Sequence, residues 1–131
     1  MTKNDFLKAF YSAFAKNIVS EEKKHNVGIS KKGLLWDIFA AKLVPCYEGD
    51  EARRLFDAVD KTGAMEIHYS GNNRFFEDDI TTSDLSDNHI QAKGIDNSGL
   101  FEFYAIGRDF EWCYIVTHEF DLCGPYFCFK Q

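Results

Sequence analysis

Proline and long apolar runs are scarce in this chain of 131 residues, which contains only two prolines. No apolar run approaches the roughly 20 residues that a membrane-spanning helix needs. The first residues also lack the basic segment and the following apolar segment of a signal peptide. We therefore expect a soluble, cytoplasmic protein without a membrane partner. Aromatic residues, at 16% of the chain, provide enough apolar material for a single globular domain over 1–131.

The four cysteines, Cys46, Cys113, Cys123 and Cys128, do not follow a metal-binding or redox spacing. No C-x-x-C pair occurs, so neither a zinc ribbon nor a thioredoxin-like motif is indicated. Glycine-rich phosphate loops of the types G-x-x-x-x-G-K and G-x-G-x-x-G are missing too. We expect no cofactor and no bound metal, and we expect the cysteines to be free thiols packed among aromatic strands.

Basic residues become scarce after residue 45. Residues 1–45 hold eight lysines and four acidic residues, whereas 46–131 hold seven basic and seventeen acidic residues, which divides the net charge of −6 into +4 and −10. Between residues 77 and 121, eleven acidic residues stand against Lys93 and Arg108. Such a field repels phosphate backbones and attracts a basic protein, so a nucleic-acid partner is disfavoured. A solvated acidic surface that keeps the protein soluble is an equally good interpretation.

Helical periodicity dominates the first half of the chain. Phe6, Phe10, Phe14 and Ile18 repeat every four residues, and Thr2 with Asp5 predicts a capped helix start. A second helix is expected from Ser30 through Leu43, ended by Pro45, and a third from about Gly49 to Val59, before Gly63.

After residue 64 the period changes from 3.6 to 2. Strands are predicted over about 65–69, 100–106, 110–119 and 126–129, with 107–109 as a hairpin turn. In the third of these, Phe110, Trp112, Tyr114 and Val116 should share one face. Between the predicted strands 65–69 and 100–106, residues 81–85 are expected to open a short helix and residues 94–99 to form a loop. Helices followed by antiparallel strands predict an α+β fold, with N-terminal helices packed on a small sheet from the C-terminal half.

A catalytic site is conceivable around Cys123. A cysteine nucleophile needs a base and a group that orients the base, and His118 and Glu119 are residues of those types. Adjacent side chains on a regular strand point to opposite faces, however, so Glu119 cannot readily orient His118. We expect a structural His118, and we do not expect an enzyme.

Three segments resemble a bacterial domain family, domain of unknown function 4275. They are DFEWCYIVTHE at 109–119, CGPYF at 123–127 and PCYEGDEA at 45–52, with Trp36 and Phe39 ahead of the last. The resemblance covers 34–129 in patches and leaves 84–99 and the first helix unmatched. It implies a compact bacterial domain and supplies no catalytic residue.

Small size, one domain and the acidic second part favour a binding protein, and most concretely an immunity-type inhibitor of a basic toxin such as a nuclease. A small enzyme that uses Cys123 and His118, or a regulatory adaptor with a partner that is not basic, are the alternatives. On the inhibitor hypothesis the candidate contacts are the acidic residues Asp78, Asp79, Asp84, Asp87, Asp109, Glu111, Glu119 and Asp121.

Overall fold

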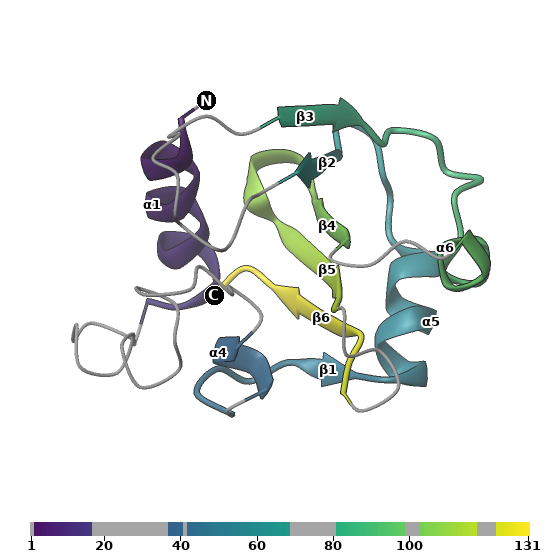
Figure 1. The fold of residues 1–131 in the computed structure, drawn as a ribbon, viewed down its shortest axis with the longest axis horizontal. Coiled ribbons are helices and arrows are strands. Elements are labelled where there is room, and N and C mark those ends of the chain that lie inside the picture. The colour runs from purple at the N-terminus through teal and green to yellow at the C-terminus, as the bar shows by residue number, and fades with distance from the viewer. Residues whose placement is uncertain (1, 17–36, 41, 69–80, 99–102, 118–122) are drawn as a thin grey trace.

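The computed structural model describes residues 2–16, 37–40, 42–68, 81–98, 103–117 and 123–131. Within these ranges one antiparallel sheet has the strand order β1-β6-β5-β4-β2-β3, and helices lie beside it (Figure 1). The strands are β1 (Tyr47–Glu48), β2 (Met65–His68), β3 (Thr81–Asp84), β4 (Phe103–Ile106), β5 (Trp112–Val116) and β6 (Tyr126–Phe129). The helices are α1 (Lys3–Phe14), α4 (Asp37–Ala40), α5 (Asp50–Ala58), α6 (Ala92–Ser98) and the 3₁₀ turn η1 (Arg108–Phe110). The predicted α+β class is confirmed.

Helix α1 begins where its capping residues predict. The Thr2 side-chain oxygen accepts a hydrogen bond from the Asp5 backbone N–H at 3.1 Å, and Asp5 places its negative charge in the first turn. Phe6, Phe10 and Phe14 are fully buried. The expected stripe is therefore confirmed as far as the end of α1, and its fourth member, Ile18, lies outside the described residues.

The second predicted helix is shorter at its C-terminal end than the sequence pattern suggests. Its described part, α4, ends at Ala40, and Lys42 then adopts a φ of 61°. Leu43, the last residue of the predicted helix, is 36% exposed. Residues 30–36 of the prediction, Trp36 among them, lie outside the described ranges. None of the helices within those ranges is long and apolar enough to cross a membrane.

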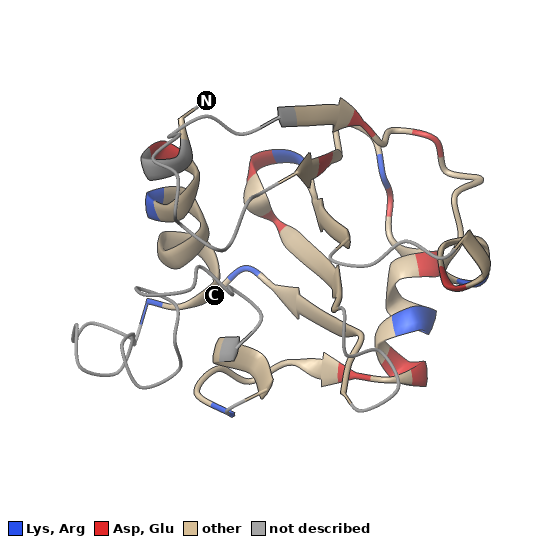
Figure 2. Ribbon diagram, viewed as in Figure 1, with Lys and Arg blue, Asp and Glu red and all other residues tan. Residues whose placement is uncertain are grey.

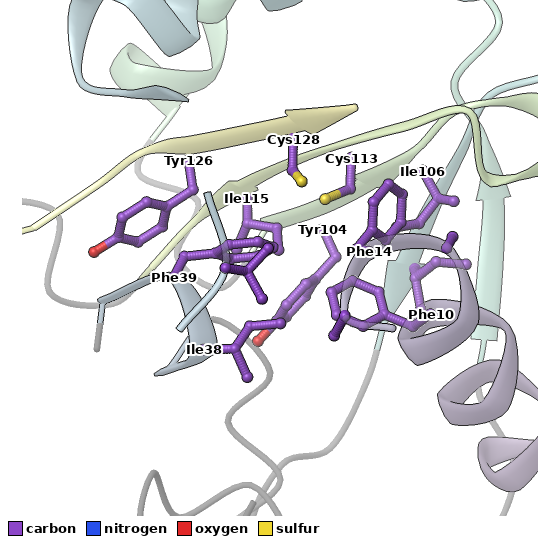
Figure 3. Close-up of a cluster of buried hydrophobic side chains, with 14 of the residues drawn as sticks. Phe10, Phe14, Ile38, Phe39, Tyr104, Ile106, Cys113, Ile115, Tyr126 and Cys128 are labelled. Carbon is purple, nitrogen blue, oxygen red and sulfur yellow. The ribbon is translucent and has the colours of Figure 1, made fainter. Parts of the chain in front are cut away.

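Two hydrophobic cores lie on opposite faces of the sheet. On the first face, α1 and α4 pack against side chains such as Ile67, Ile106 and Ile115, as Figure 3 shows for the aromatic residues of both helices. On the second face, α5 and α6 cover Trp112, Tyr114 and Val116. The predicted alternation along β5 is confirmed for Trp112, Tyr114 and Val116, and helices cover both faces of the sheet.

Phe110 is an exception to the predicted alternation. It lies in η1 with a φ of 57°, and its ring packs 6.0 Å from Phe6 and 6.5 Å from Phe14. It therefore joins the α1 face, opposite to the face of Trp112, because the turn breaks the strand period before β5 begins.

Two predictions between β2 and β4 are wrong. Residues 81–84 form strand β3, which pairs with β2 from Met65↔Asp84 to His68↔Thr81, and do not open a helix. Residues 94–98, which were expected to lie in a loop, belong to α6. Helix α6 is fixed by a hydrogen bond from the Ala92 N–H to the Asp57 carboxylate at 2.7 Å and by burial of Ala92 and Ile95. Tertiary contacts thus override the weak local propensity of both segments.

Candidate functional site

The described acidic residues that the sequence singled out lie at one end of the sheet. Met65 pairs with Asp84 on one side and with Ile106 on the other. The turn that carries Asp109 and Glu111 follows Ile106 directly, and Asp87 lies three residues after the end of β3. Figure 2 shows acidic positions at the β4–β5 turn, at the end of β3 and in the segment after it. We call Asp84, Asp87, Asp109 and Glu111 the acidic end of the sheet.

All four residues of the acidic end are exposed. The ion pairs of the described ranges involve other carboxylates, those of Glu48, Asp50, Glu51, Glu66 and Asp96. Two basic residues lie nearby. Arg108 is part of the same turn, and Lys130 is next to Glu111, since the Lys130 backbone N–H donates to the Glu111 carbonyl at 2.9 Å. Neither cation forms an ion pair with the four carboxylates among the residues described. The charge of the acidic end is therefore directed largely to solvent.

Local hydrogen bonds hold two of these carboxylates in place. The Asp84 carboxylate accepts from the Ser86 N–H at 2.9 Å, and that of Asp87 accepts from the His89 N–H at 2.8 Å. Hydrogen bonds from the Ser86 side chain and then from its backbone lower the pKa of Asp84. Asp84 therefore keeps its negative charge to a lower pH than an ordinary aspartate.

Asp60 extends this group of carboxylates and was missed in the sequence. Its carboxylate accepts hydrogen bonds from the Thr62 N–H at 2.9 Å and from the Thr62 hydroxyl at 2.8 Å. The hydrogen bond from the Thr62 backbone has the largest effect in lowering the pKa of Asp60, followed by that from the Thr62 hydroxyl. The positive charge of Arg108 lowers this pKa further. The sequence signal was the segment Asp60-Lys61-Thr62-Gly63, in which an aspartate two residues before a threonine favours such a turn.

Lys61, next to Asp60, does not neutralise this surface. The residue is fully buried, its Nζ lies 4.5 Å from the centroid of the Phe56 ring, and Nζ donates to the Val59 carbonyl at 3.4 Å. Burial lowers the pKa of Lys61, although Asp57 and Asp60 act in the opposite direction. The cation thus closes the C-terminal end of α5 and faces the core.

The remaining predicted contacts cannot be placed in this geometry. Asp78, Asp79, Glu119 and Asp121 lie outside the described residues, as does His118. Cys123, the other half of the conceivable catalytic pair, is partly buried, and its Sγ lies 3.9 Å from the Thr117 hydroxyl. Its interaction with the Tyr126 hydroxyl contributes, after burial, to a raised pKa of Tyr126.

Three other thiols are poor nucleophiles. Burial, and then the charge of Glu48, raise the pKa of Cys46 to about 11, and burial raises that of Cys128 to about 12. The pKa of the fully buried Cys113 is also raised well above its ordinary value by burial. Because the thiolate is the reactive form, these cysteines pack as small apolar residues in the folded protein.

This assignment predicts slow alkylation of the three thiols. At pH 8 we expect Cys46, Cys113 and Cys128 to react with iodoacetamide at least about tenfold more slowly in the folded protein than in the chain unfolded by urea. Peptide mass spectrometry after timed quenching measures each site separately. Labelling of any of the three at the rate of the unfolded chain would contradict the assignment.

Searches of curated proteins and of solved structures found no match to this chain. A family model does match, over residues 3–127 of 131, and its description is Domain of unknown function (DUF4275). The match includes α1 and the segment 84–99, which the sequence resemblance left out. The chain belongs to the DUF4275 family.

Proposed function

We propose that this chain is an immunity-type protein, which binds a basic toxin domain and neutralises it by protein–protein contact. The observation that carries the proposal is the acidic end of the sheet, where two segments place four exposed carboxylates without an ion pair to a described Lys or Arg. A nuclease binds phosphate through a cluster of cations, and a surface of fixed carboxylates is complementary to such a cluster.

Rigidity of the carboxylates also supports this proposal. Asp84 and Asp87 are held by backbone N–H groups, and Asp109 and Glu111 stand on a tight turn between two paired strands. A charge that is already fixed loses less conformational entropy on binding than one on a free loop. The buried thiols, in contrast, offer no nucleophile at this end of the sheet.

The direct test uses the product of the gene next to the one that encodes this chain. We expect that product to contain a basic toxic domain, to co-purify with this protein and to lose its activity in the complex. A neighbouring product that is acidic, or that stays fully active when both proteins are mixed in equal amounts, would refute the inhibitor function.

Ionic strength gives a second prediction. The association rate with the basic partner, measured by stopped-flow fluorescence, should fall at least about tenfold between roughly 0.02 M and 0.5 M salt, because salt screens the attraction between exposed charges. An uncharged osmolyte at equal osmolality is the control. A rate that does not depend on salt would instead indicate an adaptor whose partner is not basic.

A further inference from the structure

We infer that a groove beside the acidic end of the sheet receives an arginine side chain of the basic partner. This inference rests on the proposed function and adds to it a specific anchor position. The groove has a volume of about 380 Å³ and lies between α6, the segment 85–91 and strands β2 and β4. One wall is therefore the segment that follows Asp84 and includes Asp87, so the groove borders the acidic end directly.

The lining of the groove is mainly apolar. Leu85, Ile95 and Phe103 are 5%, 6% and 4% exposed, and Ile90 packs against the same core. A surface of this kind suits the three-carbon stem of an arginine, because long basic side chains bury their methylenes while their charged ends meet a polar group. The absence of a deep enclosure also favours an extended side chain over a bulky apolar one.

Glu66 provides the polar group. Its side chain is 20% exposed and lines the groove from the centre of β2. The carboxylate accepts from the Ser83 hydroxyl at 3.5 Å, and its other oxygen lies 3.8 Å from the His68 Nε2. Histidine carries charge only when protonated, and among the described residues Glu66 has no ion pair with a Lys or Arg. A partly buried carboxylate without a permanent counter-charge is a site for a guanidinium.

The flanking groups favour a cation as well. Asp87 lies on the segment that forms one wall of the groove. Among the described lining residues, only His89 can carry a positive charge. An apolar floor with a carboxylate, next to a wall segment that carries Asp87, has the anatomy of an interface hot spot for arginine.

The test uses a hexa-arginine peptide as the probe and hexa-citrulline, its neutral analogue, as the ligand control. Calorimetry at low salt gives Kd, and methyl NMR spectra report on Leu85, Ile90 and Ile95. We expect Glu66→Gln to raise Kd for the arginine peptide about tenfold or more. Glu51→Gln, an exposed position of α5 outside both the groove and the acidic end, should raise it about twofold or less. The three methyl groups should shift only with the arginine peptide.

A second variant tests the groove without removing the carboxylate. Gly94 lines the groove, and a Cβ at this helical position meets no atom within 4 Å. Gly94→Met should fill the space, keep α6 helical and raise Kd by a similar factor, while thermal melting verifies that both variants fold. If Glu66→Gln leaves Kd unchanged while Asp109→Asn raises it, with unmoved methyl signals, the groove is overturned but the acidic end remains the binding site. Wild-type binding that is equal for arginine and citrulline peptides would overturn both.

Discussion

Gly107→Ala is expected to lower the free energy of unfolding by about 3 kcal/mol, the largest effect on stability that we predict for a single methyl group. A Cβ at this position would lie 2.6 Å from Cδ1 and Cε2 of the Trp112 indole. Trp112 cannot move away freely, because it is 3% exposed, stacks on Phe127 at 5.7 Å and packs edge-on against Phe56 at 6.0 Å. The added methyl group must therefore displace the indole or open the β4–β5 turn.

Gly94→Ala is the matched control. Both changes replace glycine by alanine, but Gly94 has open space around it and lies within α6, where alanine has the better helix propensity. We expect the control to be neutral or to stabilise the protein by up to about 1 kcal/mol. Urea unfolding followed by tryptophan fluorescence measures both, and Gly107→Ala should lower the midpoint of thermal unfolding by about 10 °C. Equal stabilities of the two variants would contradict the packing of Trp112 against Gly107.

The elements that the sequence predicts well are those whose own residues repeat with one period. The stripe of α1, the apolar face of α5 and the alternation of β5 each bury side chains that recur at the period of the element. Strand β1 has only two residues and exists because Tyr47 and Glu48 pair with Phe127 and Tyr126, far along the chain. Pairings of that kind leave no periodic signal in the sequence.

The exposed elements around the acidic end illustrate the same limit. Thr82, Ser83 and Asp84 of β3 are all exposed, so neither face of this edge strand carries an apolar pattern. In α6, Gly94, Asp96 and Asn97 are poor helix formers, and the helix depends on Asp57 and on two buried side chains. In both cases the decisive contacts are made by other parts of the fold.

For the site, the sequence identified residue types but not their neighbours. It singled out Asp84 and Asp109 as acidic, and only the register through Met65 brings their segments to the same end of the sheet. Glu66 is a polar position of the strand that the sequence predicts over 65–69, where it alternates with Met65 and Ile67. Its place in a groove depends on α6, where the sequence predicts a loop over 94–99, and on the segment 85–91, which follows the helix start predicted over 81–85.

Removing the four charges of the acidic end is expected to weaken binding to the basic partner by about 3 kcal/mol, which is roughly a hundredfold in Kd. The variant combines Asp84→Asn, Asp87→Asn, Asp109→Asn and Glu111→Gln. These changes preserve the local structure, because an asparagine oxygen can still accept the hydrogen bonds from Ser86 and His89. Asp109 has a φ of 55°, a conformation that asparagine also tolerates.

A second variant with the same change in net charge separates this surface from the charge of the whole molecule. Asp5→Asn, Glu48→Gln, Asp50→Asn and Glu51→Gln remove four exposed carboxylates from α1 and from the β1–α5 region. If long-range attraction by the total charge were responsible, both variants would lose affinity equally. We expect the control to slow association only slightly, since three of its four charges lie in the β1–α5 region and are paired with Lys42, Arg53 and Arg54. Surface plasmon resonance with the immobilised partner compares the two, and an equal loss in both would exclude the acidic end as the contact surface.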